Sequence, residues 1–509
     1  MTATKLTLRR KKPESFKGDL LVSCLDQDEN GKVKIRKNIA VKELKNAIAL
    51  GDFQGKLNDS LLLYPTAPGK QKPSACRMLV IGFGKSHDKS LIELREKCRI
   101  TGGTIAVKAA ELKAERICLC LPPLNNMKGD EVVECVLEGM LLGDYRFLKY
   151  KKADRKNPAF TGIKEIVIYA PGGFKAMRHS MDKAGHVATA AKEARDMANE
   201  PGNGWTPESF AKYGRKLARR YKMRCIILGK NDLKRAKMGG ILAVNKGSSE
   251  PPRMVILEHH TTRKNAETIL IIGKGLTFDS GGVSLKPSAG MEDMKYDMCG
   301  GAAVLSTMRV VGEEKPDVNV VAIVPSTDNM GGSSALKPGD VIRHYGGITS
   351  EIVNTDAEGR LILADALAYG IKKFKPTCVI DLATLTGAVI TGLGHHRTGL
   401  LSNSQLLVER LLAAGENSGE PLWQLPLDEE YIKQIDSDVA DIKNTGGKSA
   451  GTITAAAYLQ KFVGDTPWSH MDIAGTAWGF TKKSYIPSGP SGTGVRTLVD
   501  MIRNWEKFS

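Results

Sequence analysis

The sequence predicts a two-domain α/β protein, with a smaller N-terminal α/β domain and a C-terminal α/β domain whose mostly parallel sheet is covered by helices. Its length of 509 residues exceeds what one hydrophobic core usually supports. Short apolar runs bounded by turns alternate with helical stretches, as in sheets buried between helices. One long helical pattern separates the two halves and ends at the NEPGN segment 199–203, where Pro and Gly stop helices.

Residues 1–175 form the predicted N-terminal α/β domain. Strand-like apolar runs occupy residues 19–24, 78–82, 116–121 and 165–169. Residues 5–9 alternate polar and apolar side chains, which favours a half-buried first strand. The basic residues of this opening segment are also compatible with an organelle-targeting presequence, an interpretation that the alternation disfavours.

Residues 176–204 form the predicted linking helix and the turn that ends it. Apolar side chains recur there every three or four positions, as on the buried face of a helix: Ala184, Val187, Ala191, Ala194 and Met197. We place the domain boundary on this helix, so the C-terminal domain comprises residues 205–509.

Polar residues follow the predicted strands of this second domain. The strands are expected at residues 225–228, 254–258, 268–273, 318–324, 351–353 and 378–382. Sheets of this type bind ligands just beyond the carboxyl ends of their strands. Four residues lie beyond such ends, which makes this edge the candidate site: Lys274, Asp328, Asp356 and Thr384.

Composition favours a cytoplasmic protein without a membrane span. The nine cysteines are scattered and form no CxxC pair, as expected of reduced thiols. No apolar run approaches the roughly 18 residues that a spanning helix needs. The net charge is +18, and residues 1–204 hold 37 Lys and Arg against 24 Asp and Glu. This N-terminal excess could steer nucleic acid, although a solvated surface is the simpler interpretation because no aromatic-interleaved patch accompanies it.

Two segments concentrate the unusual residues. Residues 273–301 contain seven glycines together with Lys274, Asp279, Lys286 and Asp297, in a loop that directly follows a predicted strand. A helix is expected from about residue 302. The second segment, NTDAEGRL at 354–361, places Asp356 and Glu358 two residues apart, where an extended bend can point both carboxylates the same way.

These acidic residues are candidates for a metal site. Divalent ions prefer oxygen ligands, and two neighbouring ions need bridging carboxylates to offset their repulsion. A lysine in such a site must lose its proton before it can bind a metal. From spacing alone, the same acids could instead form a helix cap, a surface charge and an ion pair. The GFGKS segment at 82–86 is not a phosphate loop, because Leu79 stands where the first glycine would be required.

Both segments resemble the signatures of the leucine aminopeptidase family of dinuclear metallopeptidases, also called cytosol aminopeptidases. EARDMANEPGNGWTP at 193–207 and DLATLTGA at 381–388 resemble further family segments, so the likeness covers roughly residues 190–509. The first domain resembles the family's variable N-terminal domain only in size and strand order. The C-terminal domain would then be the catalytic domain.

The resemblance implies a role for each residue of the two segments. Asp279 and Glu358 would bridge two divalent metal ions, Asp356 would bind one ion with its side chain and backbone carbonyl, and Lys274 with Asp297 would complete the other. Manganese or zinc, or else magnesium or cobalt, would occupy these sites. Lys286 would stabilise the oxyanion that develops on the substrate, and Arg360 would hold a bicarbonate ion that acts as general base.

The resemblance also implies the reaction and its partners. The enzyme would release N-terminal residues, preferentially leucine and other apolar ones, from short peptides, as a homohexamer. The substrate would lie against a set of matching positions: Met294, Asn354, Thr384, Leu385, Gly387 and Ala474. A DNA-binding regulatory role through the basic N-terminal domain is the alternative, since some bacterial family members combine it with peptidase activity.

Overall fold

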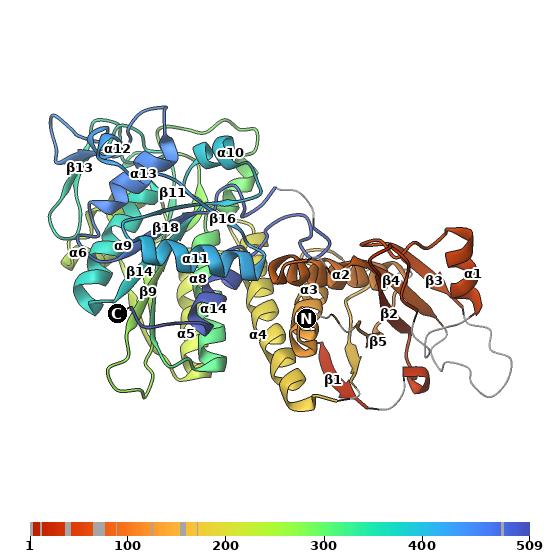
Figure 1. Ribbon diagram of the computed structural model, residues 1–509. Helices are drawn as coiled ribbons and strands as arrows, with labels where there is room; N and C mark the ends of the chain where they lie inside the picture. The colour runs from red at the N-terminus through yellow and green to blue at the C-terminus, as the bar shows by residue number, and fades with distance from the viewer. Residues whose placement is uncertain are drawn as a thin grey trace. The chain divides into compact units, whose positions relative to one another are not determined.

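The computed structural model describes residues 4–10, 13–35, 42–64, 77–87, 89–122, 124, 126–152, 159–170, 172–479 and 483–508 (Figure 1). The chain divides into two compact units, one of residues 1–189 with 482–487 and the other of residues 190–481 with 488–509. The division falls inside helix α4 (Phe174–Asn199), drawn in yellow in Figure 1. The predicted apolar face of this helix is buried: Ala184, Val187, Ala191, Ala194 and Met197.

The first unit is built on a six-stranded sheet in the order β1-β6-β5-β2-β4-β3. Neighbouring strands pair in parallel except β3, which is antiparallel to β4. Its strands are β1 (Lys5–Arg9), β2 (Leu20–Gln27), β3 (Ser60–Leu63), β4 (Met78–Lys85), β5 (Arg116–Cys120) and β6 (Glu165–Tyr169). Its helices besides α4 are α1 (Lys42–Leu50), α2 (Leu91–Glu111) and α3 (Gly129–Gly143). The strands predicted for this half are therefore confirmed.

Local sequence explains why α2 begins and packs where it does. Ser90 and Glu93 form a capping box, in which each side chain accepts from the other residue's backbone N–H and so satisfies the first turn. Gly102 of α2 and Gly139 of α3 lie against each other's helix backbone, at Val136 and Arg99, where an added Cβ atom would clash. Two glycines thus permit a close crossing of α2 and α3.

The second unit is built on a larger sheet in the order β16-β15-β18-β14-β9-β11-β8-β7, and β10 pairs with β11. The central strands β18, β14, β9 and β11 run parallel. The strands are β7 (Arg224–Leu228), β8 (Arg253–His259), β9 (Thr268–Gly273), β10 (Gly275–Asp279), β11 (Asn319–Asn329), β14 (Cys378–Ala383), β15 (Thr398–Ser402), β16 (Leu422–Gln424) and β18 (Trp468–Asp472). A small separate sheet holds β12 (Val341–Arg343), β13 (Thr349–Glu351) and β17 (Ile442–Lys443).

Helices cover both faces of the large sheet. Gly301 of α8 lies against Val324 of β11, whereas Gly370 of α9 lies against Ile323, so the two helices take opposite faces. Helices α5, α8, α14 and α11 pack in succession (Figure 1). Helices α7, α9 and α13 also pack in succession. The bounds are α5 (Pro207–Tyr221), α6 (Lys230–Arg235), α7 (Gly239–Val244), α8 (Cys299–Glu314), α9 (Gly359–Phe374), α10 (Gly387–Leu393), α11 (Gln405–Ser418), α12 (Glu429–Lys433), α13 (Gly451–Gln460) and α14 (Val495–Arg503).

Several boundaries differ from the sequence prediction, and three of them concern segments next to candidate site residues. Strand β11 continues to Asn329 rather than ending at residue 324, so Asp328 lies inside a strand and not beyond its end. This strand is longer because β8 and β10 pair with its later residues. Strand β13 ends at Glu351, two residues earlier than expected, and α8 begins at Cys299 rather than near residue 302. No helix among the described residues is long and apolar enough to cross a bilayer.

Candidate metal centre

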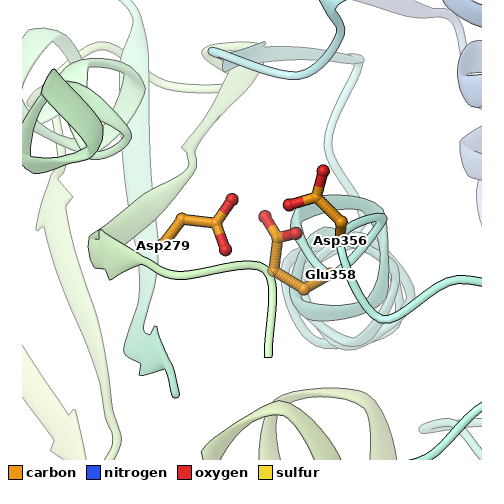
Figure 2. A group of neighbouring side chains, drawn as sticks. All are labelled: Asp279, Asp356 and Glu358. Carbon is orange, nitrogen blue, oxygen red and sulfur yellow. The ribbon is translucent and has the colours of Figure 1, made fainter. Parts of the chain in front are cut away.

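Three carboxylates converge at the carboxyl edge of the large sheet. Asp279 is the last residue of β10, and Asp356 and Glu358 lie in the turn that leads into α9. Figure 2 shows the three side chains pointing toward one another from these two segments. One oxygen atom from each lies within 4.8 Å of the other two. Asp279 and Glu358 are only 3% and 2% exposed, so these oxygens are held away from bulk water.

Lys274 and Asp297 extend this cluster. Lys274 stands between β9 and β10, and its Nζ lies 2.8 Å from Asp297 Oδ2 and 2.9 Å from Glu358 Oε1. The ammonium also donates to the carbonyl of Thr384 at 3.0 Å. A Cβ atom on Gly359 would lie 2.6 Å from this Nζ, so the glycine of NTDAEGRL lets the lysine reach the carboxylates.

Lys286 contacts the opposite side of the cluster. Its Nζ lies 2.9 Å from Asp279 Oδ2 and also forms an ion pair with Asp356 Oδ1. The loop that carries it is fixed by Thr355, whose hydroxyl donates to Gly281 O at 2.7 Å and accepts from Ser284 N at 2.8 Å. The residues from the two sequence segments are therefore joined directly.

Burial and mutual repulsion shift the protonation of these acids. Burial first, and then the neighbouring Asp279, raise the pKa of Glu358 to about 8. Burial likewise raises the pKa of Asp297 to about 6, although Lys274 opposes the shift. Burial alone would lower the pKa of Lys274 and of Lys286, but the surrounding carboxylates outweigh it and the pKa of both lysines lies above its ordinary value.

The donor set fits divalent metal ions. Four carboxylates face two ammonium groups, so the site has an excess of negative charge that a cation would offset. Glu358 Oε2 is buried and has no hydrogen-bond partner among the described residues. Asp297 Oδ2 and Asp356 Oδ1 lie close to the lysines but accept no hydrogen bond of good geometry. Buried oxygens left in this state are suited to metal coordination.

Arg360 lies on the second residue of α9, close to the carboxylates. It is 6% exposed, and its Nη1 donates to the backbone carbonyl of Asn444 at 2.9 Å. Its Nε has no hydrogen-bond partner among the described residues. Burial lowers the pKa of this guanidinium, and the charge of Glu358 opposes the shift. A donor thus remains available for an anion.

The candidate substrate residues occupy four different segments. Thr384 and Leu385 follow β14, Gly387 opens α10, and Ala474 lies two residues beyond β18. Met294 lies in a short 3-10 helix (Met291–Tyr296) just before Asp297. Thr384 Oγ1 donates to Asp297 Oδ1 at 2.6 Å, which connects this group to the charged cluster. Asn354 accepts from the backbone N–H of Asp356 at 2.9 Å and so shapes the turn that holds the carboxylate.

The sequence did not single out the residues that position the carboxylates. Asn329 Nδ2 donates to Asp279 Oδ1 at 2.9 Å and to Thr355 O at 3.0 Å. Asn444 accepts from Val353 N and donates to Asn354 O, which holds the start of the NTDAEGRL segment. These are ordinary polar residues, and their partners lie from 26 to 91 positions away in the chain.

A second polar cluster contains the residue types of a serine hydrolase but lacks access to solvent. His344 contacts Asp365 through Nδ1 at 3.3 Å and Ser350 through Nε2 at 3.1 Å, and the Tyr458 hydroxyl contacts both His344 and Ser350. All four side chains are buried. Asp365 also accepts from two backbone N–H groups, at Ile241 and Tyr345. The cluster therefore joins α7, α9 and α13 and has no route for a substrate.

Buried carboxylates at the carboxyl edge of a largely parallel sheet define the arrangement of a metal-dependent enzyme. Comparison with known proteins agrees with this class. Sequence models of the cytosol aminopeptidase family match the chain twice, the catalytic domain at residues 192–499 and the N-terminal domain at residues 24–154. The chain therefore belongs to the cytosol aminopeptidase family, and it is a metal-dependent aminopeptidase.

Individual relatives extend this similarity over nearly the whole chain. A probable cytosol aminopeptidase of Desulfotalea psychrophila is 55% identical over 494 residues, which cover 96% of this chain and 97% of that protein. One from Roseiflexus castenholzii is 40% identical over 98% of this chain and 99% of that protein.

Two solved structures share the fold. A mutant of tomato leucine aminopeptidase has a TM-score of 0.85 at 31% identity, with 99% of this chain and 97% of that chain covered. The bottromycin maturation enzyme BotP, in complex with manganese, has a TM-score of 0.83 at 29% identity, with 96% and 99% covered. Both matches confirm the predicted two-domain α/β fold.

Proposed function

We propose that this chain releases N-terminal residues from short peptides, preferentially leucine and other apolar ones, and that it works in the cytoplasm. The observation that carries the proposal is the convergence of the five candidate ligands. Asp279, Asp356 and Glu358 bring their oxygens together, and Lys274 contacts both Glu358 and Asp297.

The proposed site holds two divalent ions, manganese or zinc, or else magnesium or cobalt. Asp279 and Glu358 would bridge them and Asp356 would bind one. Asp297 would complete the other together with Lys274, which would have to lose its proton when the metal binds. When bound, the ions would polarise the peptide carbonyl and lower the pKa of a shared water. The unpartnered oxygen of Glu358 supports this assignment, as does the manganese complex of BotP.

The chain's own residues would supply charge and orientation. Lys286 would stabilise the negative charge that develops on the carbonyl oxygen, because its ammonium already faces the carboxylates that hold the ions. Arg360 would bind a bicarbonate ion as general base through its available Nε, so that no protein base is needed. Asp297 would lie near the free α-amine of the substrate, which restricts cleavage to the N-terminus.

The test is hydrolysis of a leucine amide by wild type and by Asp356→Ala, with bound metal measured in both. We expect the variant to lose metal and at least about a hundredfold in kcat/KM. The matched control is Asp317→Ala, an exposed aspartate just before the amino end of β11, which should behave as wild type. Equal activity of wild type and Asp356→Ala would refute the site.

We also propose that the chain assembles as a homohexamer. Several large apolar side chains of the second unit are exposed, as expected of surfaces that another copy covers: Val341, Val353, Trp423 and Val439. Light scattering should give six times the chain mass of 55.1 kDa. A monomeric mass at micromolar concentration would reject the hexamer without affecting the metal site.

A second candidate function is nucleic-acid binding, and one observation on α5 favours it. An open groove of about 560 Å³ is lined entirely by cations of this helix: Lys212, Arg215, Lys216, Arg219 and Arg220. Of the five, only Arg215 forms an ion pair within the described part of the chain, with Glu208. Each pair of like charges four residues apart destabilises a helix by roughly 0.2–0.5 kcal/mol. A bound polyanion would reduce this repulsion between the cations of α5. This surface adds to the basic N-terminal domain that the sequence indicated.

Charge reversal tests this second function. Duplex DNA binding that weakens steeply with salt should be lost in a Lys216→Glu, Arg219→Glu double variant. It should persist in the control Lys372→Glu, Lys373→Glu, which alters two lysines in the last turn of α9. Absence of binding by wild type would exclude the function, and equal binding by both variants would exclude α5.

A further inference from the structure

Residues 384–387, here called the 384–387 loop, comprise the connection after β14 and the first residue of α10. This loop is held at its first residue by the charged cluster. Thr384 Oγ1 donates to Asp297 Oδ1 at 2.6 Å, and Thr384 O accepts from Lys274 Nζ at 3.0 Å. This loop includes three of the proposed substrate residues, Thr384, Leu385 and Gly387. Its position therefore relates the proposed substrate pocket to the proposed metal centre.

Asp472 holds the other side of the same loop. It is the last residue of β18 and pairs in register with Ala383 of β14. Its Oδ1 accepts from Leu385 N at 3.1 Å and from Ala474 N at 3.2 Å, and its Oδ2 accepts from Thr386 Oγ1 at 2.6 Å. One carboxylate thus joins the 384–387 loop to the segment that carries Ala474, another of the proposed substrate residues.

Thr386 connects this anchor to the neighbouring helices. Besides donating to Asp472, its hydroxyl accepts from Val389 N at 3.2 Å and so caps the first turn of α10. It also contacts the Thr452 hydroxyl of α13 at 2.9 Å. Loss of this hydroxyl would release the loop from Asp472, α10 and α13 together.

Buried polar side chains of β14 and β18 form a hydrogen-bond network close to Asp472. His470 contacts Asp381 through Nδ1 at 2.6 Å, and Asp381 also accepts from Trp468 Nε1 at 2.7 Å. Burial would lower the pKa of His470, but the Asp381 carboxylate outweighs it and Asp472 adds to the effect, so the net pKa lies above its ordinary value. Burial raises the pKa of Asp472, and the charge of His470, when this side chain is protonated, opposes that shift.

We propose that Asp472 is a positioning residue that fixes the 384–387 loop and thereby sets the preference for the N-terminal residue of the substrate. This inference rests on the proposed aminopeptidase function. Asp472 is 0% exposed, and a buried carboxylate is costly unless its oxygens accept hydrogen bonds. All three of its described hydrogen bonds go to the loop and to Ala474, and it is outside the cluster of candidate metal-binding carboxylates. A carboxylate can accept all three, whereas the amide of asparagine would present a donor to the donating hydroxyl of Thr386.

The experiment compares kcat/KM for leucine amide with that for alanine amide in wild type and in Thr386→Val, Thr386→Ser and Asp472→Asn. We expect the leucine-to-alanine ratio to fall about tenfold in Thr386→Val and in Asp472→Asn, because a loosened pocket discriminates side-chain size poorly. Thr386→Ser keeps the hydroxyl and should keep the ratio within about twofold. Bound metal should remain as in wild type in all three, since none of the candidate ligands is changed.

Thr497→Val is the matched control. Thr497 Oγ1 also donates from a buried threonine to a buried carboxylate, Glu420 Oε2 at 2.8 Å. Thr497 lies on α14 and Glu420 between α11 and β16, and within the described part of the chain neither side chain is hydrogen-bonded to a candidate site residue. The Thr497→Val variant should lower the unfolding temperature about as much as Thr386→Val does. It should leave the leucine-to-alanine ratio of kcat/KM unchanged. A wild-type protein that cleaves neither amide refutes the proposed function and the inference with it. A wild-type enzyme whose ratio is unaltered by Thr386→Val refutes only the positioning role.

Discussion

The ammonium of Lys286 lies 2.9 Å from Oδ2 of Asp279, so the proposed oxyanion-stabilising cation contacts a proposed bridging ligand. The same ammonium pairs with Asp356. Lysine and metal ions would therefore share carboxylates, and the charge of the site depends on both.

Lys286→Met should separate catalysis from metal binding. We expect kcat to fall about a hundredfold to a thousandfold with a smaller change in KM, because the cation acts on charge that develops in the transition state. Metal content should stay at the wild-type level or rise. Lys295→Met removes a lysine nine positions further along the chain that lies over the ring of Tyr296, and it should leave kcat unchanged. A wild-type kcat in Lys286→Met would remove the residue from the mechanism.

Removal of metal should destabilise the protein. Burial raises the pKa of Glu358 and repulsion by Asp279 adds to the shift, so the charged carboxylates are costly in this site. Bound cations would offset this cost. At a free ion concentration of 100 times Kd, the gain in unfolding free energy would be about 2.7 kcal/mol. Calorimetry should show a lower unfolding temperature after chelation and recovery with manganese or zinc. Asp356→Ala should show no such difference, and an identical temperature for chelated and reloaded wild type would contradict the prediction.

Glu96 should stabilise the first unit except in acid. Its carboxylate accepts from Lys483 Nζ at 2.8 Å and from the Tyr485 hydroxyl at 2.7 Å. Burial would raise the pKa of Glu96, but Lys483 and its neighbours outweigh it and the pKa is lowered. A carboxyl group with a lowered pKa adds stability above its unfolded pKa of about 4.5, and the contribution is lost as the pH falls through the folded value.

Glu96→Gln should therefore unfold more easily by about 2 kcal/mol at pH 7. The difference from wild type should persist down to a pH of about 5 and shrink below about 4.5. Urea unfolding at several pH values measures it. Glu111→Gln, on the same helix with an exposed pair to Lys108, should show little difference at any pH. A difference in unfolding free energy between wild type and Glu96→Gln that grew as the pH fell would contradict a lowered pKa of Glu96.

Ser350 should matter for stability and not for catalysis. Its hydroxyl lies 2.7 Å from the Tyr458 hydroxyl and 3.1 Å from His344 Nε2, in a cluster closed to solvent. Ser350→Ala should lower the unfolding free energy by about 1 to 2 kcal/mol because it leaves buried partners less satisfied. Its kcat/KM for leucine amide should stay within about twofold of wild type. A tenfold loss at unchanged metal content would show that this cluster takes part in the reaction.

The fold was predictable where strands are buried on both faces. The run at β9 is apolar from Ile269 to Ile272 and ends in glycine, and its bounds agree with the sequence prediction. The end of β11 was not predictable in this way. Ser326 and Thr327 look like turn residues, but both are buried within the strand because β8 and β10 lie on either side of it. Pairing partners of this kind are far away in the sequence.

The candidate site was predictable for a different reason. Acids and lysines that follow predicted buried strands are conspicuous, although their spacing alone also allowed a helix cap, a surface charge and an ion pair. The resemblance to the leucine aminopeptidase family singled out Lys274 and Glu358 as candidate ligands. Asn329 and Asp472 are common residues in unremarkable contexts, and Thr355 lies within NTDAEGRL without an assigned role. Their importance depends on contacts with Asp279, Gly281 and the loop beyond β14, which only the folded chain brings together.

The segment 482–487, which belongs to the first unit although it follows most of the second, bears on how the protein is made. Ser484 donates to Ile100 O at 2.7 Å, and Tyr485 is fully buried beside Glu96. During synthesis, the first unit emerges from the ribosome long before these residues do. The first unit therefore stays incompletely packed until nearly the whole polypeptide has been translated. A fragment that stops at residue 189 would lack residues 482–487 permanently.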